Sequence, residues 1–299
     1  QGGASLQFSM VPANLKIEGK SADIVNTGSW TKKAIKEIAK ETDYNVIASS
    51  DDKNFSYIPT LDPATFNKDA SFFYTCSNNT IFGTQMKEFP NTGNVPLVCD
   101  MSSDILSRPL DINKFGLIFA GAQKNIGPSG VTVVIIRKDL AERASDSLPS
   151  MLQYRTQISN NSLYNTPPTF GIYIIDLVLK WVENNGGLAG METKNREKAQ
   201  LLYDAIDSNP FYYCPTAKDS RSDMNVVFRV TGDREDLEAR FVKEATAAGL
   251  SGLKGHRSVG GLRASIYNAH PRAGVEALVN FMSDFAKQHE AELTSQAVS

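Results

Sequence analysis

The sequence predicts an α/β fold, in which a large domain with a mostly parallel, mixed sheet flanked by helices precedes a small α+β domain. Three observations lead to this prediction. The chain has 299 residues, enough for a large domain and a smaller companion. Up to about Lys180, short β-branched or aromatic runs alternate with helical stretches, which is typical of βα units. After Gly190 the elements become fewer and longer.

In the first part, strands are expected where short apolar runs lie between turn residues. These runs are 22–26, 44–48, 71–76, 96–101, 116–120 and 131–137. A helix is expected over 31–42, where apolar residues recur on one face, and another over 169–183, closed by the Asn-Asn-Gly-Gly run 184–187. A helix is also expected to begin near Leu6, and Pro12 is expected to kink it or end it early.

In the second part the expected order is helix, strand, helix, strand, helix, which favours an α+β domain. The expected elements are 192–208, 225–230, 233–248, 262–267 and 273–289. We place the domain boundary near 186–191, which gives a large domain over 1–188 and a small domain over 189–299. The residues after His289 are small and polar, and we expect them to fray.

Composition excludes several classes of protein. The 31 basic and 33 acidic residues give a net charge of −2, so no general attraction to nucleic acid or an anionic membrane is expected. The longest apolar runs, 117–120 and 131–136, are far too short to span a bilayer, and no signal peptide is recognisable. Cys76, Cys99 and Cys214 show no C-x-x-C spacing, which argues against a metal site or a disulfide framework. A soluble, cytoplasmic protein is expected.

A glycine-rich turn stands at the start of the chain. Gly2 and Gly3 precede Ala4, Ser5 and an expected helix, and free N–H groups at a helix start can bind an anion such as phosphate. The alternative, favoured by this feature alone, is an ordinary turn.

Asp100 and Lys124 each follow an apolar strand. Asp100 ends the run 96–99, at the carboxyl end of an expected parallel strand, where ligands of open α/β sheets bind. Lys124 lies just past the strand 116–120 in a glycine-rich loop, and burial can lower the pKa of such a lysine as Schiff-base chemistry requires. The alternatives are a loop-capping aspartate and a solvated lysine.

Further candidates are aromatic or cationic. Trp30 begins an expected helix and could stack on a planar ligand, or staple that helix to the core. His256, Arg257 and Arg263 surround the pair Gly260-Gly261 and could clamp an anion, although surface arginines are common.

An anion loop, a strand-end aspartate, a loop lysine and a stacking aromatic are together what pyridoxal phosphate requires. The sequence resembles the phosphoserine aminotransferase family of fold type I pyridoxal-phosphate enzymes over nearly its whole length. The segments that are most similar to this family are 101–113, 120–130, 165–170 and 255–269.

The resemblance implies roles for the cofactor-binding residues. Lys124 would form the Schiff base, Asp100 would pair with the pyridine nitrogen, Trp30 would stack on the ring, and Thr80 would lie near its phenolic oxygen. Phosphate ligands would come from the same chain and, across a homodimer interface, from the neighbouring subunit. The same-chain ligands are Ala4, Ser5 and Gln123, and the neighbour's are Asn165 and Thr166.

For the substrate, the resemblance implies that Arg263 grips the α-carboxylate and that His256 and Arg257 lie near the distal anion. The implied reaction is reversible amino transfer between L-glutamate and 3-phosphohydroxypyruvate, in L-serine biosynthesis. No metal is implied.

Three alternatives stay open. In this family a segment with a His-Arg pair precedes the glycine-rich loop, whereas this sequence begins at Gln1, so a catalytically incomplete fragment that only binds the cofactor or dimerises is one alternative. A second is another fold type I aminotransferase, and a nucleotide-binding module is the weakest. Asn79 also departs from the family, where glutamate is common, and Ser5 lies at a variable position.

Overall fold

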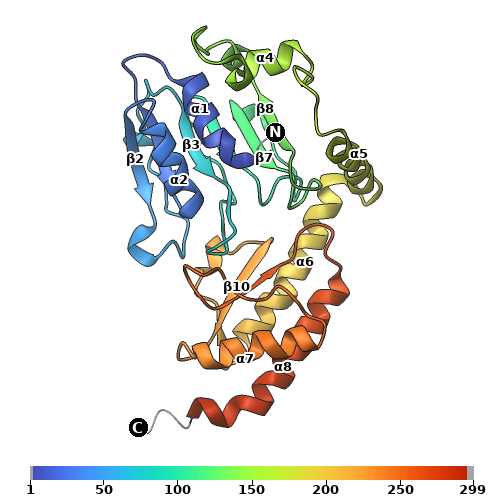
Figure 1. Ribbon diagram of the computed structural model, residues 1–299. Helices are drawn as coiled ribbons and strands as arrows, with labels where there is room; N and C mark the ends of the chain where they lie inside the picture. Colours follow the sequence, from blue (N-terminus) through green and yellow to red (C-terminus); the bar gives the residue numbers. More distant parts are fainter. Residues whose placement is uncertain (1–2, 295–299) are drawn as a thin grey trace.

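A six-stranded mixed sheet forms the larger part of the computed structural model, which describes residues 3–294 (Figure 1). Neighbouring strands are parallel except β7 and β8, which are antiparallel. The strands lie in the order β2 (Tyr44–Ser49), β1 (Ala22–Asn26), β3 (Phe73–Cys76), β6 (Leu97–Asp100), β7 (Leu117–Gly121) and β8 (Thr132–Ile136). All six predicted strands are present, and the predicted fold class is confirmed.

The central strands are buried on both faces, which explains their continuous apolar runs. Along β7, Phe119 packs on one face with Phe8 of α1 (Gln7–Leu15), while Ile118 packs on the other. Helices α1 and α2 (Ser29–Ile38) cover the first face, as Figure 1 shows. The strands that carry the site are therefore held from both sides.

The antiparallel direction of β8 follows from the short connection before it. A parallel partner needs a crossover of a dozen or more residues, whereas only ten residues separate β7 from β8. Ala122 N–H donates to Val131 O at 3.0 Å and closes this turn. The turn contains Lys124, so the lysine sits in a tight, internally bonded loop.

Pro12 does not end its helix, which was one of the two outcomes expected there, and the predicted end of the next helix was wrong. Helix α1 continues to Leu15, three residues past Pro12, because Val11 and Leu15 are buried in the core and Asn14 binds Leu152 O at 2.7 Å. Packing thus outweighs the hydrogen bond that proline removes. Helix α2 ends at Ile38 rather than at residue 42, in turns closed by a hydrogen bond from Thr42 Oγ1 to Lys20 O at 2.7 Å.

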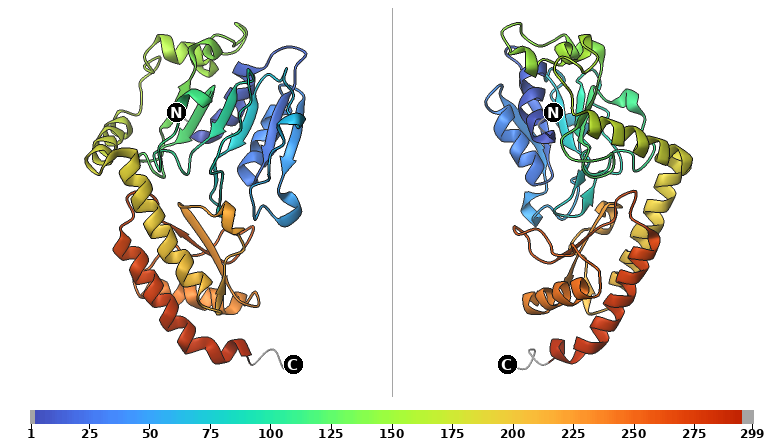
Figure 2. Two further views of the ribbon diagram at one scale, coloured as in Figure 1. Left: turned by 180° about the vertical axis from the view of Figure 1, so that it is seen from behind. Right: turned by 45° about the vertical axis from the view of Figure 1, so that its right-hand side comes forward.

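A second unit, with a three-stranded antiparallel sheet, follows in the chain. Its strands lie in the order β11 (Leu262–Ser265), β10 (Asn225–Val230) and β9 (Tyr212–Tyr213). Its helices are α6 (Gly187–Asp207), α7 (Glu235–Ala247) and α8 (Arg272–Thr294). Figure 2 shows α6 and α8 running side by side. The order of helices and longer strands is as predicted, and only the short β9 was missed.

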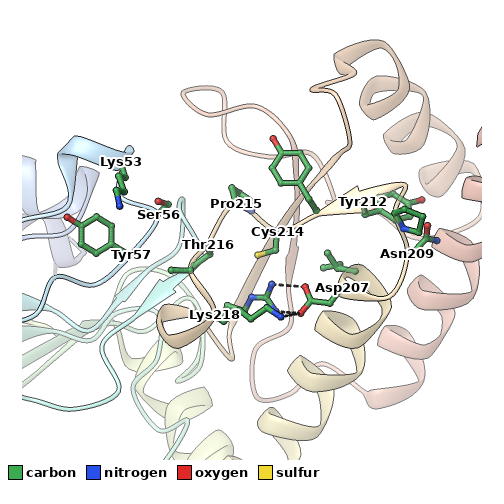
Figure 3. Close-up of a pocket in the computed structure, with 15 residues that line it drawn as sticks. Lys53, Ser56, Tyr57, Asp207, Asn209, Tyr212, Cys214, Pro215, Thr216 and Lys218 are labelled. Atoms are coloured by element: carbon green, nitrogen blue, oxygen red, sulfur yellow. Dashed lines mark hydrogen bonds and ion pairs between the residues drawn. The ribbon is translucent and has the colours of Figure 1, made fainter. Parts of the chain in front are cut away.

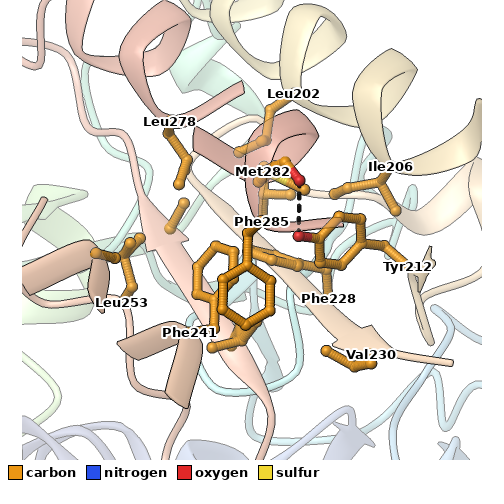
Figure 4. Packing of buried hydrophobic residues seen from close by; sticks show 14 of the residues in the cluster. Leu202, Ile206, Tyr212, Phe228, Val230, Phe241, Leu253, Leu278, Met282 and Phe285 are labelled. Carbon is orange, nitrogen blue, oxygen red and sulfur yellow. Dashed lines mark hydrogen bonds between the residues drawn. The ribbon is translucent and has the colours of Figure 1, made fainter. Parts of the chain in front are cut away.

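Aromatic rings fill the core of this second unit (Figure 4). Phe241 contacts Phe228 and Phe285 edge to face, with ring centroids 5.9 and 5.1 Å apart. Tyr212 is buried with them and donates its hydroxyl hydrogen to Met282 O at 2.9 Å. The core is separate from the two clusters of the larger sheet.

Helix α8 extends to Thr294, so the prediction of fraying after His289 was wrong up to that residue, and 295–299 lie outside the described residues. The predicted boundary at 188/189 falls just inside α6, and the division into two domains stays a prediction.

Helix α5 stands beside the larger sheet (Figure 1). No helix among residues 3–294 is long and apolar enough to cross a bilayer. The remaining elements are α3 (Lys138–Ala141), α4 (Tyr154–Ser159), α5 (Thr169–Asn184), β4 (Asn78–Asn79) and β5 (Thr84–Gln85).

Candidate active site

Asp100 and Lys124 lie at the same edge of the larger sheet. Asp100 is the last residue of β6, and Lys124 follows β7. The two strands are parallel neighbours with Asp100 opposite Phe119, so their carboxyl ends meet. This edge is where open α/β sheets bind ligands.

The Lys124 ammonium is surrounded by two other predicted residues. Its Nζ donates to Thr80 Oγ1 at 2.7 Å and lies 5.9 Å from the centroid of the Trp30 ring. Thr80 follows β4, and Trp30 is the second residue of α2. Three segments far apart in the sequence therefore converge on one amine.

Asp100 is a buried carboxylate, with 5% of its surface exposed. Burial raises its pKa, whereas hydrogen bonds from Ser102 and the charge of Lys124 oppose the rise. Ser102 donates to Asp100 Oδ1 from its backbone N at 2.9 Å and from its Oγ at 2.6 Å. An anion held in this way is suited to pair with a cationic ring nitrogen.

Trp30 is positioned by a close approach of backbone at Gly28. A Cβ atom at Gly28 would lie 2.9 Å from Asn79 Oδ1 and 3.3 Å from the Phe82 ring, so a larger residue there would displace these side chains. Within residues 3–294 the Trp30 indole N–H is buried without a partner, and Lys33 Nζ lies 4.5 Å from the ring centroid. The ring is fixed in place beside Lys124.

The chain start forms a turn where the anion site was predicted, and its role in binding an anion stays a prediction; Gln1 and Gly2 lie outside the described residues. Gly3 has φ +70°, and a 3-10 helix over Ala4–Leu6 follows and leads directly into α1. Within the described part of the chain, the backbone N–H groups of Ala4 and Ser5 have no acceptor. This helix contacts β7, and Gln123 after β7 lies exposed against Gly121.

The predicted substrate residues come from the second unit. Arg263 on β11 is half-buried, and its Nη1 lies 3.5 Å from Thr80 O. Its Nε is buried and has no hydrogen-bond partner in the described part of the chain. Burial, followed by the charges of Arg263, Arg257 and Lys33, lowers the pKa of His256. These cations surround His256 without a carboxylate partner in the described chain, which favours an anionic ligand.

A cavity of about 270 Å³ opens between the two units and is lined by His256 and Arg263. Lys53, from the segment after β2, lines it from the opposite side. A neighbouring cavity of about 510 Å³ lies between residues 53–57 and 206–221 (Figure 3). It contains none of the predicted site residues, and Arg221 there is paired with Asp207 through two bonds of 2.7 and 2.8 Å.

Asn165 and Thr166 are not brought to this site. Both are exposed on the loop between α4 and α5, and Asn165 lines a groove beside β8. Asn165 Nδ2 donates to Thr166 O at 3.3 Å, a contact within the loop itself. Their predicted role across a subunit interface stays a prediction.

The donor set fits pyridoxal phosphate. The backbone N–H groups of Ala4 and Ser5, which have no acceptor within residues 3–294, suit its phosphate. The Trp30 ring suits its aromatic face, and Asp100 suits its ring nitrogen. No group of three or more His, Cys, Asp or Glu side chains in residues 3–294 is arranged to hold a metal ion. The fold and the site together define a fold type I aminotransferase.

Comparison with known proteins agrees with this classification. The class-V aminotransferase family model matches residues 1–278. Phosphoserine aminotransferase of Desulfosudis oleivorans is 61% identical over 293 residues, covering 96% of this chain and 79% of that protein. This chain therefore belongs to the phosphoserine aminotransferase family, within the class-V aminotransferases.

Solved structures show the same relationship. Phosphoserine aminotransferase from Bacillus circulans subsp. alkalophilus matches with a TM-score of 0.93 and 55% identity, over 97% of this chain and 80% of that one. A phosphoserine aminotransferase from Trichomonas vaginalis with bound pyridoxal phosphate matches with a TM-score of 0.87 and 43% identity, over 94% and 80%.

Sequence reasoning missed several residues at the site. Ser102 was not among the predicted site residues, although a serine two residues after a strand-end aspartate is placed to hold its carboxylate. Lys33 and Lys53 look like ordinary surface lysines, and nothing in the sequence distinguishes them. Their proximity to the site arises from the tertiary fold.

Proposed function

We propose that this chain acts as a homodimeric aminotransferase that moves an amino group reversibly between L-glutamate and 3-phosphohydroxypyruvate, giving O-phospho-L-serine and 2-oxoglutarate. One observation carries the proposal. Lys124 is bonded to Thr80 beside Trp30, next to the buried Asp100, in a chain 61% identical to a phosphoserine aminotransferase.

The cofactor is held by residues with distinct tasks. Pyridoxal phosphate, when bound, supplies an electron sink for the bonds at the substrate's α-carbon. Asp100 keeps a proton on the ring nitrogen, and Trp30 packs on the ring face. The phosphate ligands are the backbone of Ala4 and Ser5 together with Gln123. Asn165 and Thr166 of the neighbouring subunit complete the phosphate site.

Lys124 has two tasks at its Nζ. It would hold the cofactor covalently, and as a free amine it would be placed to accept and return the proton at the substrate's α-carbon. Nζ donates to Thr80 Oγ1 at 2.7 Å, which holds the amine at the site. Loss of Lys124 removes both functions, so it is the most damaging single change.

The substrate's two anions are bound by different groups. Arg263 grips the α-carboxylate, since its guanidinium reaches Thr80 O at 3.5 Å, next to the Lys124 amine. His256 and Arg257 take the distal phosphate or carboxylate. Glutamate and phosphoserine share the amino-acid end, so one pocket serves both half-reactions.

A homodimer is supported by the exposed apolar face of α5. Of its residues only Gly171 and Val182 are buried, while Phe170 and Tyr173 are 73% and 57% exposed. Such a patch marks an interaction surface, and it follows directly on Asn165 and Thr166. We place the enzyme in the cytoplasm, where its biosynthetic bacterial relatives would work.

An absorbance experiment tests the proposal. Wild-type protein loaded with pyridoxal phosphate is expected to show a yellow, borohydride-reducible band that O-phosphoserine converts to the pyridoxamine form. Lys124→Ala should lack the reducible band, and Lys114→Ala, an exposed lysine elsewhere, should keep it. A band that ignores phosphoserine would support an incomplete fragment or another fold type I aminotransferase, and no Lys124-dependent band would refute the proposal.

A further inference from the structure

A buried lysine outside the active site has an unusual set of partners. Lys198 lies on α6 with 3% of its surface exposed. Its Nζ donates to three backbone carbonyls, Tyr267 O at 2.8 Å and Ile266 O and His270 O at 3.0 Å, with Asn268 O further away at 3.5 Å. An ammonium has three N–H donors, so the three short bonds satisfy it fully.

No carboxylate neutralises this charge. Within residues 3–294 Lys198 forms no ion pair, and Lys194, one turn earlier on α6, repels it. Burial and that repulsion lower the pKa of Lys198 to about 8, so the ammonium is still the main form at neutral pH. The converging carbonyl dipoles are the counter-charge that residues 3–294 provide. Tyr267 O also accepts from the His270 N–H at 2.9 Å, so loss of the ammonium would fall mainly on the carbonyls of Ile266 and His270.

The segment that Lys198 holds connects two parts of the active site. Residues 266–270 follow directly on β11, which carries Arg263. From this segment, Asn268 N–H donates to Asn125 Oδ1 at 3.0 Å, and Asn268 Nδ2 donates to Leu106 O at 2.9 Å. Asn125 is buried and adjacent to Lys124 in sequence.

A second residue of α6 supports the same segment. Asn195, one turn before Lys198, donates from Nδ2 to Asn268 Oδ1 at 2.8 Å and to Ser107 O at 3.2 Å. Asn125 Nδ2 in turn donates to Ile105 O at 3.0 Å. A continuous set of buried hydrogen bonds thus joins α6, the 266–270 segment and the loop of Lys124.

We propose that Lys198 is a built-in cation that fixes the carbonyls of residues 266–270 and thereby, through Asn268 and Asn125, positions Lys124 relative to Arg263. Lys198 is a positioning residue, because it touches neither substrate nor cofactor. As far as catalysis is concerned, the inference rests on the proposed function. The arrangement of the segment itself does not depend on that function.

The test removes the ammonium and then returns it from solution. Lys198→Ala deletes the side chain beyond Cβ, and n-propylammonium replaces the missing atoms. In the holoenzyme we expect Lys198→Ala to lower kcat about tenfold or more, with a smaller change in KM for glutamate, because the reacting amine loses its orientation while β11 keeps Arg263 in its sheet. Propylammonium chloride should restore part of kcat, and sodium chloride at equal ionic strength should not.

Two control variants show whether the effect on kcat comes from the charge at position 198. Lys194→Ala removes an exposed lysine one turn away, and it should keep the wild-type kcat and show no response to propylammonium. Lys198→Gln keeps two N–H donors and fills the site, so it should fold, lose kcat and not be rescued. If Lys198→Ala does not fold, Lys198→Gln alone carries the prediction, and a wild-type kcat in that variant would overturn it.

Thermal unfolding separates this inference from the proposed function. Propylammonium should raise the Tm of Lys198→Ala but not that of wild type or Lys194→Ala, whichever substrates the enzyme accepts. A raised Tm in an enzyme inactive on phosphoserine would refute the proposed function and leave the cation role standing. If neither Tm nor kcat of Lys198→Ala responds to propylammonium, the cation role is wrong.

Discussion

At the scale of single residues, Asp100 shows how a functional charge works against stability. It is buried at the end of β6, and burial raises its pKa above the ordinary value of 3.8. A raised carboxyl pKa means that the folded chain holds the proton more tightly than the unfolded chain does, so the free energy of unfolding falls as pH rises through this interval. We expect apo Asp100→Asn to be more stable than wild type at pH 7, by about 1 kcal/mol or more.

The same change should lower the transamination rate of the holoenzyme by about 100-fold or more, since the ring nitrogen loses its anion. Thermal unfolding of the apo proteins at pH 4 and pH 7 measures the first effect, and the stability difference should shrink at the lower pH. Asp69→Asn, an exposed carboxylate, serves as control and should change neither quantity. A less stable apo Asp100→Asn at pH 7 would contradict this account.

At the scale of elements, α5 carries an unpartnered apolar stripe. Phe170, Tyr173 and Leu177 are 73%, 57% and 42% exposed, and their spacing places them on one side of the helix. We expect Phe170→Asp combined with Leu177→Asp to convert a dimer to a monomer, because a charge in an apolar interface is strongly unfavourable. Sedimentation velocity measures the mass, and cofactor affinity should fall with it, as Asn165 and Thr166 leave the neighbouring site.

Glu183→Ala, at an exposed polar position of the same helix, should remain dimeric. A double variant with the wild-type mass, or a wild-type protein that is already monomeric, would show that this face of α5 does not form the interface.

At the scale of the whole molecule, the two sheet units meet through buried polar groups rather than through a shared apolar core. Asn78 is 2% exposed and donates to Asn225 Oδ1 and to Ser103 Oγ, both at 2.8 Å, and Ser222 Oγ donates to Asn78 Oδ1 at 2.5 Å. We expect Asn78→Leu to uncouple the unfolding of the two units, because it leaves partners on both sides unsatisfied, at about 1–3 kcal/mol for each buried group.

The sequence provides the probes for this experiment. Its two tryptophans, Trp30 and Trp181, both precede α6, so fluorescence follows the first unit, while far-ultraviolet circular dichroism follows both. Denaturant curves from the two probes should coincide for wild type and for the exposed control Asn94→Leu, and they should separate for Asn78→Leu. Coincident curves for Asn78→Leu would mean that the units are coupled by other contacts.

How much of the fold and of the site could be predicted depended on whether the local pattern of residues indicates the structure at that position. The run 116–120 predicted β7 to within one residue because strands buried on both faces have little choice of composition. The two-residue strand Tyr212–Tyr213 has no periodicity to detect. Lys124 and Asp100 could be found because their position after a strand is itself a signal. The role of Lys198 could not be predicted, because a lysine on a polar helix is usually exposed and its burial here results from the tertiary structure.

The ammonium of Lys198 is covalently part of the chain, and this determines how the carbonyl site is occupied. A carbonyl site that took its cation from the surrounding solution would fill and empty as the ionic composition of that solution changed. Here each chain brings one charge on its own helix, bonded to three carbonyls within 3.0 Å. Occupancy is therefore set when the polypeptide is synthesised, and if Lys198 has the proposed positioning role, the geometry that it supports should not vary with the ionic composition of the solution.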